Sequence, residues 1–181
     1  QVLYTYESPT LEEIIHYTNQ HSDNGLAEAI MRMVGFQKFG DQTVSAGKEA
    51  VIDHLTAIGF DLRGFNYIDG SGLSHSNTVM PIAQAKFLAS RMKEEYFKDY
   101  FDSLPIAGQS GTLRHMFLNS DANGQIFAKT GTLNKVKALA GFIKTKSGRT
   151  LTFSLLVNNY AGSVAQVKQK MEELLTPTLD L

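Results

Sequence analysis

The sequence predicts an α+β fold in which helices come first, an antiparallel sheet follows, and a last helix covers the sheet. Apolar residues recur at helical spacing through the first hundred residues, whereas alternating or continuous apolar runs bounded by turn residues occupy residues 126–158. Short turns between successive strands favour an antiparallel meander over alternating βαβ units. The 181 residues are enough for one domain with its own core.

Caps and glycines divide the first sixty residues into three predicted helices. Residues 2–6 alternate weakly and predict a strand or an extended segment. Ser8-Pro9-Thr10 offers a start for the first helix, and Ser22-Asp23-Asn24 can cap a second one that Gly35 plausibly ends. The apolar spacing of residues 44–58 predicts a third helix.

The middle of the chain alternates loops with helices. Residues 69–74, with the sequence DGSGLS, predict a tight turn. Residues 80–100 predict two helical pieces, and residues 103–112 return to loop because Pro105 and two glycines interrupt them.

Three strands and a helix are predicted in the last third. Residues 126–128 form a short strand, and residues 136–145 and 150–158 form longer ones joined by a hairpin turn at residues 146–148. The third strand is nearly all apolar, which predicts a central strand covered on both faces. Residues 164–175 have the spacing of a terminal amphipathic helix.

A sheet that is covered on both faces usually has more than three strands. We therefore expect the sheet to be incomplete in this chain, with further strands supplied from a segment before residue 1. The first residue is Gln rather than Met, which fits a trimmed or processed chain.

Composition argues against several classes of function. The formal net charge of −1 provides no basic field for nucleic acid, and no run of about 18 apolar residues could span a membrane. Cysteine is absent, so disulfides and zinc–thiolate sites are excluded. The five histidines lack the spacing of metal ligands, and no metal site is predicted.

Two short motifs carry the chemistry. Ser22-Asp23-Asn24 precedes Lys129-Thr130-Gly131 by 107 residues, and Thr132 follows the second motif. Alone, the first motif is also an ordinary helix cap and the second an ordinary strand end. In this order, the pair accompanies a Ser-x-x-Lys motif in penicillin-binding proteins and class A β-lactamases.

The first motif and the lysine suit acyl transfer, which needs a proton path to the leaving amine. The hydroxyl of Ser22 can relay a proton, and the amide of Asn24 can hold a substrate carbonyl and orient a lysine. Lys129 supplies a positive charge for a substrate carboxylate and keeps the region around Ser22 electropositive.

The rest of the second motif suits an extended substrate. Gly131 has no side chain to obstruct a peptide lying along the strand edge. The hydroxyls of Thr130 and Thr132 can bind a carboxylate. The backbone N–H of Thr132 can be one donor of an oxyanion hole, with the substrate pairing to the strand.

Five segments together resemble one family in order and spacing. That family is the low-molecular-mass penicillin-binding proteins of the D-alanyl-D-alanine carboxypeptidase/endopeptidase type, which have an inserted region between their first and second motifs. In such proteins the DGSGLS loop borders the substrate pocket, so the resemblance implies that Leu73 and Leu133 form an apolar wall. The segments are residues 22–28, 69–74, 104–113, 128–133 and 140–142.

The resemblance implies a serine hydrolase of the periplasm or cell envelope. Such enzymes remove terminal D-Ala from peptidoglycan stem peptides or cut cross-links between them, and β-lactam antibiotics acylate them. Neither a metal nor an organic cofactor is implied. Residues 1–181 would then be the C-terminal part of a penicillin-binding catalytic domain.

The sequence departs from this family at the nucleophile. The family places Ser-x-x-Lys well before the Ser-x-Asn motif, and residues 1–21 contain none. The stretch Ser45-Ala46-Gly47-Lys48 matches literally, but it follows Ser22, and a helix N-cap explains Ser45. We therefore expect the nucleophile to lie upstream, and the isolated chain to be inactive.

Three alternatives stay open. A class A β-lactamase shares both motifs, but it also needs a Glu-x-x-Leu-Asn segment that this chain lacks. A non-catalytic peptidoglycan-binding module would keep Asn24 and Lys129 as ligand contacts without turnover. An α+β domain with coincidental motifs is the third alternative, and it requires five segments to align by chance.

Overall fold

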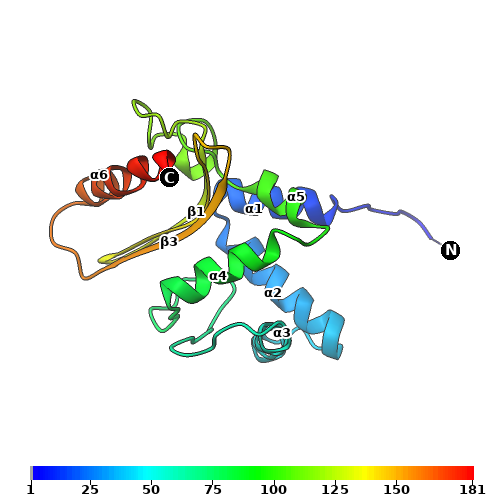
Figure 1. Cartoon of the computed structure of the whole chain (residues 1–181). Coiled ribbons are helices and arrows are strands. Elements are labelled where there is room, and N and C mark those ends of the chain that lie inside the picture. Colours follow the sequence, from blue (N-terminus) through cyan, green and yellow to red (C-terminus); the bar gives the residue numbers. More distant parts are fainter. Residues whose placement is uncertain (1) are drawn as a thin grey trace.

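The computed structural model describes residues 2–181 and confirms the α+β architecture. Helices precede the three strands, and one further helix follows them (Figure 1). The helices are α1 Leu11–His21, α2 Asn24–Phe39, α3 Val44–Ala57, α4 Pro81–Arg91, α5 Phe97–Ser103 and α6 Val164–Leu175; short 3-10 helices are η1 Gly111–Leu113 and η2 Thr176–Asp180; the strands are β1 Ile126–Leu133, β2 Val136–Lys144 and β3 Thr150–Asn158.

The sheet is an antiparallel meander in the order β1-β2-β3, so β2 is its central strand. The prediction that β3 is central is therefore wrong, but the prediction that both its faces are covered holds. Alternate side chains of β3 pack against the cluster under α6, while the hydroxyls of Thr152 and Ser154 bond to Ala85 and Gln84 of α4.

Strand β1 is longer than predicted, because it continues past Ala128 to Leu133. Residues 129–132 have no apolar pattern, and their extended conformation follows from pairing with β2, with Lys129 opposite Ala140 and Thr132 opposite Lys137. The whole second motif thus lies on a strand.

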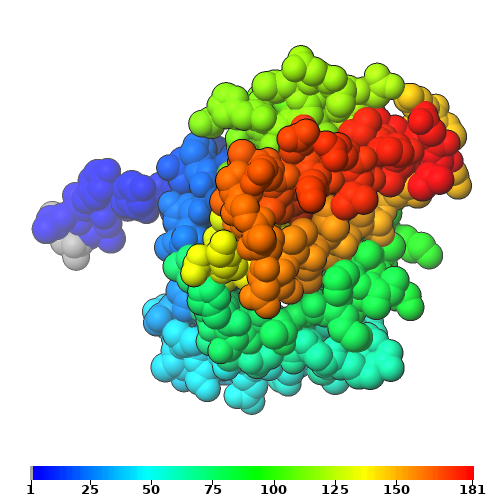
Figure 2. All heavy atoms as spheres, turned by 90° about the vertical axis from the view of Figure 1, so that its left-hand side faces the viewer, coloured from blue at the N-terminus to red at the C-terminus, as the bar shows by residue number. Residues whose placement is uncertain are grey.

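Two clusters form the core, one on each side of the sheet. Under α6, the buried side chains include Phe117, Leu139 and Met171. On the other face, Phe142 is fully buried among aromatic side chains of α5 and β1, including Phe101. Figure 2 shows α6 in orange and red lying beside the last strand, and the N-terminal residues extending away from the body.

Helix α2 does not end at Gly35, as the sequence had suggested. It runs to Phe39, and Gly40 ends it with a φ of 72°. Gly35 is buried where α2 crosses α3, and a Cβ there would lie 2.6 Å from the backbone nitrogen of Gly47. Gly35 is needed for this close approach and not for a turn.

Two further expectations at chain ends and caps are corrected. Thr43, not Ser45, is the N-cap of α3, and Ser45 lies exposed within the first turn. Residues 2–6 are exposed and form no strand. No helix among residues 2–181 is long and apolar enough to cross a membrane.

Candidate active site

Ser22 is the first residue of a two-residue corner between α1 and α2, which Asp23 completes. It ends α1 in the left-handed region, with φ 55° and ψ 48°, and its backbone N–H bonds to Thr18 O. Asp23 then starts α2, because its carboxylate accepts a bond of 2.9 Å from the N–H of Leu26. A left-handed conformation costs a non-glycine residue about 1 kcal/mol or more, so the corner fixes Ser22 at the expense of local strain.

Lys129 of β1 reaches this corner. Its Nζ lies 2.5 Å from Ser22 Oγ and 2.9 Å from the carbonyl oxygen of Thr130. Burial lowers the pKa of Lys129 from its usual range. An ammonium group can only donate, so Ser22 Oγ accepts, and the hydrogen of its hydroxyl is free to be donated to another group.

Polar contacts that the sequence analysis missed hold α1 against the rest of the site. Asn19 Nδ2 donates to Ser103 Oγ at 2.7 Å, and Gln20 Nε2 donates to Ser103 O at 2.9 Å. Ser103 is buried (2 % exposed). A serine at the end of a short helix gives no sequence signal of this role, because its partners lie more than eighty positions away.

The outer edge of β1 is open where the second motif lies. Before the motif, Ala107 N bonds to Ile126 O and Ala128 N bonds to Pro105 O. Backbone groups of alternate residues point to the same edge of a strand, so Thr130 and Thr132 also direct their N–H and C=O groups outward. Beyond Ala128, no described strand pairs with this edge.

Both threonine side chains point to the α6 side of the sheet. Thr130 Oγ1 donates to Thr112 Oγ1 at 2.9 Å. Thr132 Oγ1 accepts a hydrogen bond from Lys137 Nζ across the strand pair. Lys137 is a second lysine of this site that the motif analysis did not identify.

The remaining predicted residues are less constrained. Asn24 is the first residue of α2 and is exposed, and none of the side-chain hydrogen bonds among residues 2–181 involves it. Leu73 is 54 % exposed, and Leu133 ends β1 half-buried. Their role as an apolar wall stays a prediction.

The loop that carries Leu73 is organised by one carboxylate. Asp69 accepts hydrogen bonds from the backbone of Gly72, Leu73 and Ser74, and from the side chains of Ser71 and Asn77. Burial raises the pKa of Asp69, but these bonds outweigh burial and lower it overall.

The same loop is fixed to α2 through Gly70. Its N–H donates to Glu28 Oε2 at 2.8 Å, and a Cβ on Gly70 would lie 2.7 Å from Ala27 O. The predicted turn therefore lies directly against the helix that begins with Asn24.

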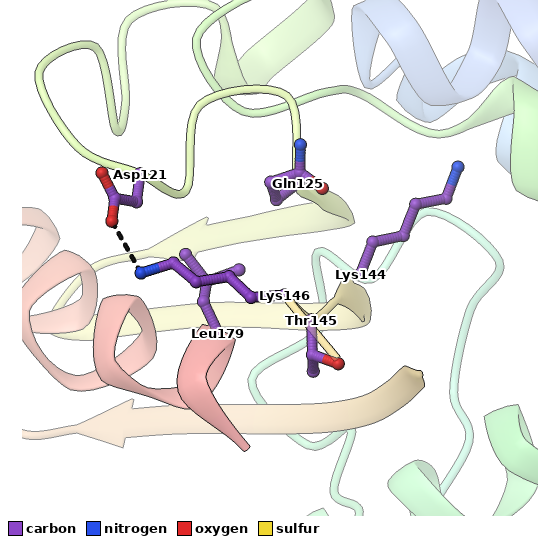
Figure 3. A pocket seen from close by; sticks show the side chains of 6 residues that line it. All are labelled: Asp121, Gln125, Lys144, Thr145, Lys146 and Leu179. Atoms are coloured by element: carbon purple, nitrogen blue, oxygen red, sulfur yellow. Dashed lines mark ion pairs between the residues drawn. The ribbon is translucent and has the colours of Figure 1, made fainter. Parts of the chain in front are cut away.

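A surface pocket lies away from this site. Asp121, Gln125, Lys144, Lys146 and neighbouring residues line it at the far end of β1 and β2 from Thr132 (Figure 3). The charge of Lys146 is neutralised there by Asp121, with Nζ and Oδ2 2.8 Å apart. Among the described residues, no group of three acidic or histidine side chains could hold a metal ion.

Comparisons with known proteins identify relatives over nearly the whole chain. Residues 1–178 match the model of the D-Ala-D-Ala carboxypeptidase 3 (S13) family. The chain is 37 % identical over 158 residues to carboxypeptidase DacB of Mycolicibacterium smegmatis and 34 % identical over 167 residues to the D-alanyl-D-alanine carboxypeptidase of Actinomadura sp.. These alignments cover 84 % and 90 % of this chain, but only 34 % and 31 % of the relatives.

Solved structures agree on the fold. Penicillin binding protein 4 of Haemophilus influenzae superposes with a TM-score of 0.86 at 27 % identity, over 93 % of this chain and 40 % of that one. A further structure of that protein is a complex with a β-lactam. The TLA-3 β-lactamase has a TM-score of 0.70 at 15 % identity, which shows a shared fold alone. The chain spans about a third of the length of the curated relatives it matches.

Proposed function

Because this chain belongs to the D-Ala-D-Ala carboxypeptidase 3 (S13) family, we propose that it supplies the second and third motifs of a serine-type carboxypeptidase or endopeptidase site. The substrates are peptidoglycan stem peptides, cleaved through an acyl-enzyme. The site works in the periplasm or cell envelope and also accepts β-lactams. Residues 1–181 are the C-terminal part of the catalytic domain.

The contact between Lys129 and Ser22 is the observation that carries the proposal. With Lys129 Nζ donating to Ser22 Oγ at 2.5 Å, the serine hydroxyl can pass its hydrogen to a leaving amine and recover a proton afterwards. The buried lysine also keeps this position electropositive, which favours an approaching carboxylate.

The open edge of β1 provides the binding surface. An extended peptide can pair with the outward N–H and C=O groups of Thr130 and Thr132 by strand addition. The N–H of Thr132 is one oxyanion-hole donor in this arrangement. Gly131 leaves the strand unobstructed, while Asn24, Leu73 and Leu133 contact the substrate from the helical side.

The attacking oxygen comes from a Ser-x-x-Lys motif outside this chain. This chain aligns with about a third of its relative's length, so such a protein has room for this motif outside the aligned part. Ser45 is unsuited as the nucleophile because it is exposed and makes no hydrogen bond with Lys48, Ser22 or Lys129 among the described residues. Residues 1–181 alone therefore form half of the oxyanion hole, the relay and the carboxylate anchor, but not the nucleophile.

Labelling with a fluorescent penicillin tests this proposal. The protein as its gene encodes it should form a covalent adduct on a serine upstream of residue 1, and the 181-residue chain should remain unlabelled. An adduct on Ser45 would overturn the assignment of the nucleophile. A gene-encoded protein that binds stem peptides but is never acylated would instead support a non-catalytic peptidoglycan-binding module.

A further inference from the structure

Lys137 is a buried cation of the site that has no acidic partner among the described residues. It lies on the central strand β2 with 4 % of its surface exposed, and its Nζ donates to Thr132 Oγ1. No carboxylate among residues 2–181 lies within ion-pair distance of it. The charged groups that act on it, Lys168 of α6 and Lys129 of β1, are both cationic.

Such an arrangement is costly for the folded state. Burial first, and then repulsion from Lys168 and Lys129, lowers the pKa of Lys137 to about 8. Buried lysines are normally paired with an acid, and an apolar residue would fill this strand position at lower cost. With no acidic partner among residues 2–181, the ammonium group is available to an anion that binds beside Thr132.

The hydrogen bond to Thr132 shows where that partner would bind. An ammonium group has no acceptor, so Thr132 Oγ1 must accept from Lys137, and the hydroxyl hydrogen must point elsewhere. Thr132 is exposed on the open edge of β1, where its N–H also points outward. The pair therefore offers a fixed O–H donor with a positive charge directly behind it.

We propose that Lys137 is a positioning residue for anionic substrates, fixing the Thr132 hydroxyl as a donor to the free C-terminal carboxylate of an acyl-D-Ala-D-Ala peptide. This role rests on the function proposed above and adds a specificity element to it. A peptide whose C-terminus is blocked as an amide lacks the charge and gains nothing from Lys137.

A pH dependence follows from the same geometry. Below pH 8, Lys137 is charged and donates to Thr132, so the carboxylate is held. Above pH 8 the side chain of Lys137 becomes neutral and can accept a hydrogen bond from the Thr132 hydroxyl. The hydroxyl hydrogen then points to Lys137 and no longer to the substrate. A bound carboxylate favours the charged form, so binding raises the pKa of Lys137.

Calorimetric titration of the gene-encoded protein with N-acetyl-D-Ala-D-Ala, and with its C-terminal amide, tests the inference. At pH 7, Lys137→Met should weaken binding of the carboxylate ligand about tenfold and leave binding of the amide unchanged. Lys137→Arg should keep most of the affinity and remove its decline above pH 8. Lys168→Met is the matched control, because it removes a neighbouring charge not bonded to Thr132, and should stay within about twofold of wild type.

A double-mutant cycle with Thr132→Val separates positioning from general packing. If Lys137 acts through Thr132, adding Lys137→Met to Thr132→Val should cause little further loss. A Lys137→Met protein that binds the carboxylate ligand like wild type, or that loses both ligands equally, contradicts the role of Lys137 while leaving the proposed function intact. A wild-type protein that binds neither ligand contradicts the proposed function and this inference together.

Discussion

Lys129 Nζ and Ser22 Oγ lie 2.5 Å apart although 107 residues separate them in the sequence. One group comes from a helix corner and the other from a strand. Their meeting depends on the hydrogen bonds of Asn19 and Gln20 to Ser103, which attach α1 to the segment preceding the sheet. The fold thereby brings together two motifs that are individually common.

In the gene-encoded protein, replacing Ser22 with alanine should slow acylation by a fluorescent penicillin about 100-fold or more, because the leaving group loses its proton donor. The far-ultraviolet circular dichroism should not change, since the side chain caps neither helix. Ser45→Ala is the matched control and should leave the rate at the wild-type value. Equal losses in both variants would contradict the relay.

Stability should respond to pH through Lys137. Its pKa is about 8 in the folded chain and near 10.5 when unfolded, so between these values the unfolded state binds more protons. The free energy of unfolding should therefore rise from pH 8 to pH 10.5, by an upper limit of about 3 kcal/mol. Urea titrations across this range measure the slope.

The control for that experiment is Lys137→Met, which cannot titrate. It should lose most of the slope and be at least as stable as wild type at pH 7, because a buried unpaired charge has been removed. A variant that is clearly less stable at pH 7 would mean that the lysine is retained for packing.

Gly35→Ala should destabilise the protein by about 1–3 kcal/mol, because the new methyl group would lie 2.6 Å from Gly47 N and force α2 away from α3. Thermal unfolding measures this loss. Gly25→Ala in the same helix is the control. Its methyl group would meet nothing closer than 3.4 Å, so its unfolding midpoint should not fall.

Asp69→Ala should loosen the loop around Leu73 and cost about 1 kcal/mol, because five exposed or partly buried donors lose a charged acceptor. Hydrogen exchange at the amides of Gly72, Leu73 and Ser74 should accelerate, and affinity for stem peptides should fall. Asp61→Ala, in an exposed ion pair with Arg63, should leave those amides protected. Unchanged exchange in Asp69→Ala would contradict the organising role of this carboxylate.

The Asp69 contribution to stability depends on pH with the same sign as that of Lys137, but at acid pH, because folding lowers the pKa of both groups. The hydrogen bonds hold the pKa of Asp69 below its usual value, so its stabilisation is complete above pH 3.8 and is lost as the pH falls through the lowered folded-state pKa.

The sequence was a good guide where periodicity and caps act locally. Helices α3 and α6, and strands β2 and β3, begin and end close to their predicted limits, and α1 and α4 begin close to theirs. Two of the errors share one cause, which is that a long-range contact decided the outcome. Gly35 serves the approach of α3, and the extension of β1 beyond Ala128 depends on pairing with β2.

The residues of the candidate site also fall into those that the sequence indicated and those that it did not. The motifs placed Ser22 and Lys129 in one site, and the structure brings their side chains into contact. No motif indicated Lys137, because a lysine beyond the turn after β1 looks like an exposed strand residue. Its burial becomes visible only when α6 covers that face of the sheet. Ser103 was missed because its partners in α1, Asn19 and Gln20, lie far from it in the sequence.

The Ser22–Lys129 contact also bears on how the protein folds. Closing a loop of 107 residues costs roughly 4 kcal/mol of chain entropy, so this contact cannot nucleate folding and should form after α2, α3 and the β1–β2 hairpin. Partly folded forms would then lack a working relay. Penicillin labelling during refolding would follow the last step of assembly, and its rate could be compared with that of secondary-structure formation in the same sample.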